Sequence, residues 1–302
     1  MDATKLKIMV TGASGLLGRA VVKEAESRGH TVIGTAFSRA TDKLAKLDLS
    51  DEQAVSDFLT KHRPQAIIHC AAEKRPDVAE SNQTAVEQLN AQVPGYLAQQ
   101  AKQLNAFFVY ISTDYVFDGT KPPYQVDDQP NPLNFYGRTK LAGEKAVLAA
   151  NKQAAILRVP VLYGAAKDPK ESAVNVLVDL VRDSSDAKVD ALQARFPTCT
   201  DDVARVLVDM TEVSVGSAGE NISGIFHFSA KEELTKYQMC QAFAQILKLK
   251  DLNGITPITE KPKEPVATRP DNCQLSTEAL EEIGINVSFV PFCQWWTEYL
   301  QA

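Results

Sequence analysis

Five short apolar runs in the first half of the chain constrain its fold more than any other feature. They are separated by stretches typical of helices and lie at residues 6–10, 31–37, 66–71, 106–112 and 154–159. Strands that are apolar on both faces and alternate with helices form a parallel sheet with helices on both sides. The sequence therefore predicts a doubly wound parallel α/β domain.

The second half of the chain has a different pattern. One further buried strand is expected at 224–228, and Thr235 is expected to cap a helix after it. We expect the chain to return to the first sheet at that strand. The sequence therefore predicts a larger domain formed by residues 5–165 and 196–229. It also predicts a smaller, interleaved α/β domain formed by residues 166–195 and 230–302.

Composition excludes several classes of protein. The 302 residues include 32 Lys and Arg and 38 Asp and Glu, a net charge of −6, which argues against partners such as nucleic acid or anionic membranes. No apolar run approaches the ~20 residues that span a bilayer, and Lys5 and Lys7 interrupt the apolar start, unlike in a signal peptide. The five scattered cysteines contain no CxxC pair, which suits a reducing compartment and offers no metal site. We expect a cytoplasmic protein without a metal.

A glycine-rich turn follows the first expected strand. Gly12, Gly15 and Gly18 form a G-x-x-G-x-x-G pattern where the strand ends and a helix begins. The first glycine would permit a tight turn, the second would let the backbone approach a pyrophosphate, and the third would let the helix pack close to the strand. The helix N-terminus would offer N–H groups to the phosphates. An ordinary glycine turn is the alternative, but the strand–turn–helix context favours a dinucleotide site in a Rossmann domain.

The end of the second expected strand indicates which dinucleotide binds. NAD-specific sites usually have an acidic residue there, which binds the ribose 2′-hydroxyl. This strand ends at Phe37 and continues with Ser38 and Arg39, a hydroxyl and a guanidinium that suit a 2′-phosphate. The pattern favours NADP over NAD, unless Arg39 is an ordinary solvated loop charge. Asp48 and Leu49 follow a third short apolar piece and are expected to cover the adenine.

Tyr136 and Lys140 form a Y-x-x-x-K pair, and this spacing places both side chains on one helix face. A nearby ammonium, together with the positive nicotinamide, would lower the tyrosine pKa from its usual value of about 10, and the lysine would also reach the nicotinamide ribose. Ser112 and Thr113 end the fourth strand, where ligands of such sheets bind, and supply a hydroxyl that can polarise a carbonyl. The pair alone is common by chance, but its position after this strand end predicts a catalytic site.

With these residues in place, the chain resembles the extended short-chain dehydrogenase/reductases, and among them the dTDP-4-dehydrorhamnose reductase group. The resemblance rests on residues 11–18, 111–119 and 136–140, and Arg158 and the Arg269-Pro270 pair also fit. It implies that Thr113, Tyr136 and Lys140 are catalytic and that hydride passes from NAD(P)H to a keto-sugar nucleotide. Together with the motifs above, it gives an expected cofactor site of Gly12, Ser14, Gly15, Leu16, Leu17, Gly18, Ser38, Arg39, Asp48, Leu49, Ala71, Ala72, Glu73, Asn90, Tyr136, Lys140 and Pro160.

Residues 69–80, HCAAEKRPDVAE, are more similar to the regulatory (beta) subunits of methionine adenosyltransferase than to the sugar reductases. That similarity implies an NADP-binding protein whose partner is the catalytic subunit that makes S-adenosylmethionine. The charged residues Glu73, Lys74, Arg75 and Asp77 are expected beside the nicotinamide, unless they only pair with one another in a solvated loop.

Two functions therefore stay open, and the regulatory subunit is slightly favoured. The alternative is an NADPH-dependent ketoreductase in which Tyr136 donates a proton, Thr113 polarises the carbonyl and Arg195 binds a phosphate of a nucleotide sugar. A cofactor-sensing protein without turnover is a third interpretation. The aromatic residues Trp295, Trp296 and Tyr299 are expected either to anchor a partner or to close the core of the smaller domain.

Overall fold

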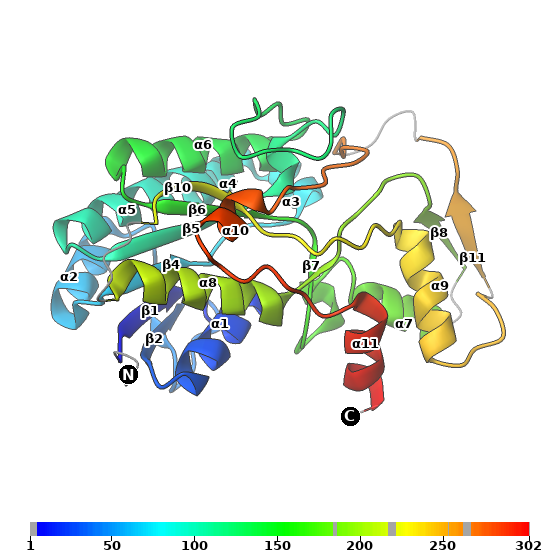
Figure 1. Cartoon of the computed structure of the whole chain (residues 1–302), viewed down its shortest axis with the longest axis horizontal. Coiled ribbons are helices and arrows are strands. Elements are labelled where there is room, and N and C mark those ends of the chain that lie inside the picture. Colours follow the sequence, from blue (N-terminus) through cyan, green and yellow to red (C-terminus); the bar gives the residue numbers. More distant parts are fainter. Residues whose placement is uncertain (1–4, 184–185, 217–221, 253, 262–266, 302) are drawn as a thin grey trace.

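The computed structural model describes residues 5–183, 186–216, 222–252, 254–261 and 267–301. Its larger part is a sheet of seven parallel strands in the order β10-β6-β5-β4-β1-β2-β3, with helices on both faces (Figure 1). The strands are β1 (Lys7–Thr11), β2 (Thr31–Ala36), β3 (Ala45–Lys46), β4 (Ala66–His69), β5 (Phe107–Thr113), β6 (Ala155–Val159) and β10 (Gly224–His227). This arrangement confirms the predicted doubly wound α/β fold.

Both faces of the sheet are buried, which explains why its strands are apolar throughout. Ile8 and Val10 of β1 pack in one core with residues of α1 (Leu16–Ser27) and α8 (Thr200–Val215). Met9 points to the opposite face, as alternate strand residues must, and packs in a second core. Three helices cover that second face: α2 (Glu52–His62), α5 (Val93–Gln103) and α6 (Phe135–Ala150).

Strand β10 returns the chain to the large sheet more than 60 residues after the end of β6. It pairs in parallel with β6, from Gly224 opposite Ala155 to His227 opposite Arg158, so the predicted return at 224–228 is confirmed. The short helix α10 (Glu278–Glu282) follows much later in the chain, yet Leu280 lies in the same core as residues of the sheet and of α8. This part of the chain was expected to belong to the smaller domain, whereas it contributes to the core of the larger one.

A smaller lobe lies beside the end of the sheet (Figure 1). It contains α7 (Val176–Arg182), α9 (Lys236–Ile246), α11 (Phe292–Gln301) and a two-stranded parallel sheet of β8 (Ala187–Asp190) and β11 (Ile255–Ile258). Its core includes Phe243, Phe292 and Trp296. The helix α9 begins at Thr235 as predicted, since the hydroxyl of Thr235 and the side chain of Gln238 form a capping box.

The remaining elements are short and lie in the connections between these helices and strands. They are α3 (Pro76–Ser81), α4 (Gln83–Glu87), the π-helix η1 (Gln88–Gln92), the 3₁₀-helices η2 (Asp114–Val116) and η3 (Pro169–Glu171), and the strands β7 (Leu162–Tyr163) and β9 (Thr198–Cys199). Over the ranges described above, no helix combines the length and apolar character needed to cross a bilayer.

Candidate cofactor and catalytic site

The glycine-rich turn joins β1 to α1 as the sequence predicts. Gly12 has a φ of +64°, which favours glycine, and a Cβ there would lie 2.8 Å from the backbone nitrogen of Ala71. A Cβ on Gly18 would lie 2.2 Å from the carbonyl oxygen of Gly12, so the helix can approach the strand only because this residue has no side chain. A Cβ on Gly15 would meet only the oxygen of Gly12, at 3.2 Å. The outer side of the turn at Gly15 is therefore open to a ligand.

Ser38 and Arg39 follow β2 and are both exposed. Arg39 is not simply a solvated charge, because its guanidinium forms an ion pair with Glu171 of η3 at 2.8 Å. Asp48 and Leu49 follow β3; the Asp48 carboxylate accepts hydrogen bonds from Ser50, and Leu49 is buried in the core beneath α2. The ion pair with Glu171 was not predicted, because Glu171 lies more than 130 residues from Arg39 in the chain.

The loop after β4 lies beside the glycine-rich turn and is fixed by Asn90. The backbone N–H of Glu73 donates to the side-chain oxygen of Asn90 at 3.0 Å, and the Asn90 amide donates to the carbonyl oxygen of Glu73 at 3.0 Å. The Asn90 amide also donates to the hydroxyl of Thr139 on α6 at 3.2 Å. Asn90 thus ties the loop that contains Ala71 and Ala72 to the helix that carries Tyr136.

The charged residues of this loop pair in three different ways. Glu73 forms an ion pair with Arg75 at 2.8 Å, as a solvated loop would. Asp77 pairs instead with Arg269 at 2.8 Å, and the ammonium of Lys74 donates to the carbonyl oxygen of Glu171. The loop is therefore linked both to the C-terminal part of the chain and to η3.

Thr113, at the end of β5, and Tyr136 and Lys140, on α6, are all buried. Burial raises the pKa of Tyr136 well above its usual value, although a hydrogen bond with the Thr113 hydroxyl lowers it in part. The ammonium of Lys140 donates to the carbonyl oxygen of Ile111 at 2.7 Å and lies 4.0 Å from the ring centre of Tyr110. Burial therefore dominates the pKa of Tyr136 in this arrangement, and the lowering expected from Lys140 together with a bound nicotinamide stays a prediction.

Burial also acts on Lys140, lowering its pKa to about 7, while the charge of Glu144 opposes that shift. Glu144 lies on the same helix and pairs with Arg158 of β6 at 2.7 Å. The hydroxyl of Ser112 donates to Glu144 at 2.5 Å. The hydroxyl of Ser112 is thus bound to this buried ion pair. The hydroxyl of Thr113 is the one at the strand end that lies beside Tyr136.

Asp114 is a site residue to which the sequence analysis assigned no role. The hydroxyl of Thr113 donates to its Oδ1 at 3.0 Å. Burial raises the pKa of Asp114 to about 7, and the positive charge of Arg195 opposes this shift. Its position directly after Thr113 was the available signal, but sequence spacing does not reveal burial.

Arg195 is less available to bind a phosphate than the sequence suggests. Its guanidinium donates to the carbonyl oxygen of Pro270 at 3.0 Å and to the side chain of Gln193 at 2.5 Å, and the residue is 5% exposed. It braces the C-terminal loop instead of presenting a free guanidinium to a phosphate. Pro160, which directly follows β6, is buried as well.

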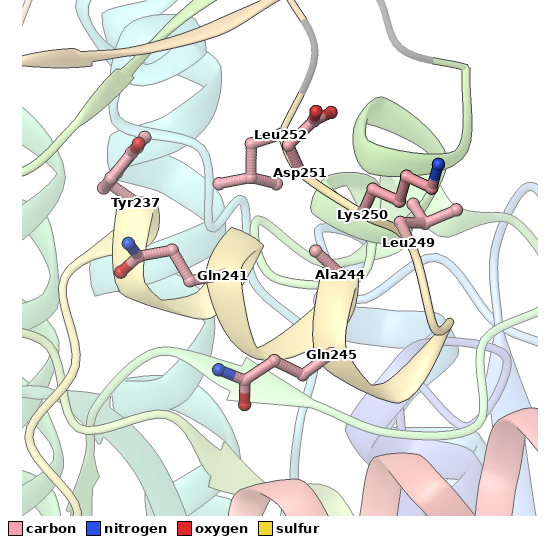
Figure 2. Close-up of a pocket in the computed structure, with 8 residues that line it drawn as sticks. All are labelled: Tyr237, Gln241, Ala244, Gln245, Leu249, Lys250, Asp251 and Leu252. Atoms are coloured by element: carbon pink, nitrogen blue, oxygen red, sulfur yellow. The ribbon is translucent and has the colours of Figure 1, made fainter.

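The expected site residues thus gather at one edge of the sheet, where β1, β2, β4, β5 and β6 end. Figure 2 shows a pocket on the smaller lobe, away from this edge, and none of the expected site residues lines it. The pocket is lined by Tyr237, Gln241, Ala244, Gln245, Leu249, Lys250, Asp251 and Leu252. In the described part of the chain, no group of three or more His, Cys, Asp or Glu residues could hold a metal ion.

Comparisons with known proteins agree on the family. Residues 6–299 match the model of the RmlD substrate binding domain. The chain is 46% identical over 280 residues to methionine adenosyltransferase 2 subunit beta from Bos taurus, covering 92% of this chain and 83% of that protein.

Solved structures of reductases have the same fold. A dTDP-4-dehydrorhamnose reductase ortholog from Clostridium acetobutylicum has a TM-score of 0.84 at 31% identity, covering 98% of this chain and 99% of the other. The dTDP-4-dehydrorhamnose reductase from Bacillus anthracis, in complex with NADP, has a TM-score of 0.83 at 25% identity, covering 99% and 100%. The chain therefore belongs to the RmlD substrate binding domain family of extended short-chain dehydrogenase/reductases, together with the beta subunits of methionine adenosyltransferase 2.

Proposed function

We propose that this protein is an NADP-binding regulatory subunit of methionine adenosyltransferase and acts in S-adenosylmethionine biosynthesis. The observation that carries this proposal is the 46% identity to a beta subunit over 92% of the chain, compared with 31% to a reductase of known structure. The partner is accordingly the catalytic subunit of methionine adenosyltransferase.

The geometry of the strand ends supports the cofactor in this proposal. The open side of the turn at Gly15 leaves room for a pyrophosphate at the start of α1. Arg39 offers a guanidinium to the 2′-phosphate that distinguishes NADP from NAD, although that guanidinium already pairs with Glu171. The Bacillus anthracis reductase, which has the same fold, was solved in complex with NADP.

Association with the catalytic subunit is the direct test. The two purified proteins are mixed at micromolar concentrations and analysed by size-exclusion chromatography with light scattering. We expect a single complex with a mass above that of either protein. A bacterial dTDP-4-dehydrorhamnose reductase of the same fold is the matched control and should elute separately. Separate elution of this protein from the catalytic subunit would overturn the proposed function.

A ketoreductase is the second candidate, and the buried set of Thr113, Tyr136 and Lys140 favours it. Bound NADPH would supply the hydride to the carbonyl carbon. The raised pKa keeps Tyr136 protonated, so its phenol holds the proton that the carbonyl oxygen needs, and the adjacent Thr113 hydroxyl is placed to orient that oxygen.

Oxidation of NADPH in the presence of keto-sugar nucleotides tests this second function. Activity that disappears in Tyr136→Phe would establish a reductase. Lack of oxidation with every substrate of the panel, combined with binding to the catalytic subunit, would leave the regulatory role alone. Activity that survives the substitution would exclude Tyr136 as the proton donor.

A further inference from the structure

One acidic residue at the cofactor site contacts positive side chains that follow three different strands. Glu171, the last residue of η3, accepts hydrogen bonds from Arg19 on the first turns of α1, at 3.1 Å and 2.6 Å. It also accepts one from Arg39, after β2, at 2.8 Å. Lys74, after β4, donates to the main-chain carbonyl of the same residue. These three positive side chains approach each other because Glu171 lies between them.

The environment of Glu171 keeps it ionised. Its side chain is 9% exposed, whereas that of Arg39 is 59% exposed. Burial tends to raise the carboxyl pKa, but hydrogen bonds and positive charge from Arg19, with smaller contributions from Lys167 and Arg39, lower it to about 2. Glu171 is therefore a negative charge at any physiological pH.

Arg19 links Glu171 to the glycine-rich turn. Arg19 donates to the carbonyl oxygen of Ser14, within that turn, at 2.7 Å and to that of Ala165 at 3.2 Å. Two bonds from the half-buried Arg19 anchor the carboxylate there, and a single bond from the exposed Arg39 completes its contacts with guanidinium groups. The contact of Glu171 with Arg39 is therefore weaker than its contact with Arg19, and an incoming anion can take the place of Glu171 on Arg39.

We propose that Glu171 is a residue that sets the choice between NADP and NAD, because its carboxylate competes with the 2′-phosphate for Arg39. This inference rests on the proposed binding of NADP. A 2′-phosphate must exchange the Glu171–Arg39 ion pair for its own and must then lie near a negative charge. The 2′-hydroxyl of NAD meets neither obstacle. Glu171 therefore reduces the preference for NADP that Ser38 and Arg39 create.

Calorimetric titration with NADPH and with NADH tests this inference. In Glu171→Gln the competing charge is lost, and an ion pair with one exposed partner corresponds to a change in Kd of up to about fivefold. We expect the Kd for NADPH to fall by about that factor and the Kd for NADH to change by less than about twofold. Glu26→Gln removes the same charge from the exposed far end of α1 and should change neither Kd.

A second pair of variants shows whether the effect acts through Arg39. In an Arg39→Gln background, Glu171→Gln should no longer tighten NADPH binding, since the group for which the two anions compete is gone. If Glu171→Gln does not fold, Glu171→Asp serves instead, because its shorter side chain keeps the charge near Arg19 and withdraws from Arg39.

The outcomes separate this inference from the proposed function. Weaker NADPH binding in the Glu171 variants, or an equal change for NADPH and NADH, would overturn the selectivity role while the cofactor assignment stands. Failure of the wild-type protein to bind either dinucleotide would overturn both the NADP assignment and this inference.

Discussion

At the scale of single residues, Asp114 links the chemistry of the site to pH. A threonine hydroxyl has one hydrogen to donate, and that of Thr113 is directed to Asp114. An ionised Asp114 accepts this hydrogen and keeps it from a ligand. A protonated Asp114 can donate to Thr113 instead, which frees the threonine hydrogen for a carbonyl oxygen. Because burial raises the pKa of Asp114 to about 7, this exchange falls in the physiological range.

Replacement of Asp114 by Asn should change how stability depends on pH. The folded-state pKa of about 7 lies above the ordinary value of 3.8, so between these values the folded protein holds a proton that the unfolded chain has released. The contribution of Asp114 to stability therefore declines as pH rises through this window, by on the order of 2–4 kcal/mol in total. Thermal unfolding from pH 4 to 8 should show a smaller loss of stability for Asp114→Asn than for the wild-type protein. Parallel profiles would contradict the prediction.

At the scale of elements, two glycines of the turn between β1 and α1 have different roles: Gly18 is needed for packing and Gly15 for the approach of a ligand. Gly18→Ala would place a methyl group 2.2 Å from the carbonyl oxygen of Gly12, a backbone contact that cannot move away cheaply. We expect it to lower the free energy of unfolding by about 3 kcal/mol, at the upper end of the range for overpacking. Urea unfolding followed by circular dichroism measures this change.

Gly15→Ala is the matched comparison in the same turn. Its methyl group would meet only one atom, at 3.2 Å, and the φ of −80° suits alanine. We expect a loss of at most about 1 kcal/mol in the free energy of unfolding, but a rise in the Kd for NADPH of at least tenfold, since the methyl group would stand where a pyrophosphate approaches. Equal stability losses in the two variants would show that the turn does not divide these roles.

The same scale shows what the sequence could and could not predict. The long strands of the seven-stranded sheet and the glycine-rich turn have local signals, namely apolar runs and fixed glycine spacing, and these were predicted. The strands β8 and β11 of the smaller lobe were not. Glu171 was not, since its contact with Arg19 joins residues 152 positions apart and a short polar loop has no pattern. The packing of Leu280 in the core of the larger part was missed for the same reason. The spacing of Tyr136 and Lys140 was clear, but burial, which controls their pKa values, depends on the whole fold.

At the scale of the whole molecule, α11 closes the core of the smaller lobe. Trp296 is 1% exposed and Tyr299 is 38% exposed. Trp295 is partly buried and packs against the same core as Trp296. Of the two roles expected for these aromatic residues, the core role is the correct one for Trp296. Tyr299 stacks on Trp295 with ring centres 4.7 Å apart.

Truncation of each aromatic residue should separate these roles. Trp296→Ala should lower the free energy of unfolding by about 3–5 kcal/mol, as for other buried aromatic residues. Tyr299→Ala should cost about 1 kcal/mol or less. Chemical denaturation of both variants measures the difference, and similar losses would show that Tyr299 also belongs to the core.

The position of β10 also has a consequence for synthesis of the chain. On the ribosome, the first six strands of the sheet emerge well before residue 224, so β6 has a bare hydrogen-bonding edge during that interval. Unpaired edges of this kind recruit other strands and promote aggregation. A fragment that ends at residue 165 would keep that edge permanently, even though it contains the entire glycine-rich turn and the Tyr136–Lys140 pair. The nascent protein therefore depends on its later half to finish a sheet that its earlier half begins.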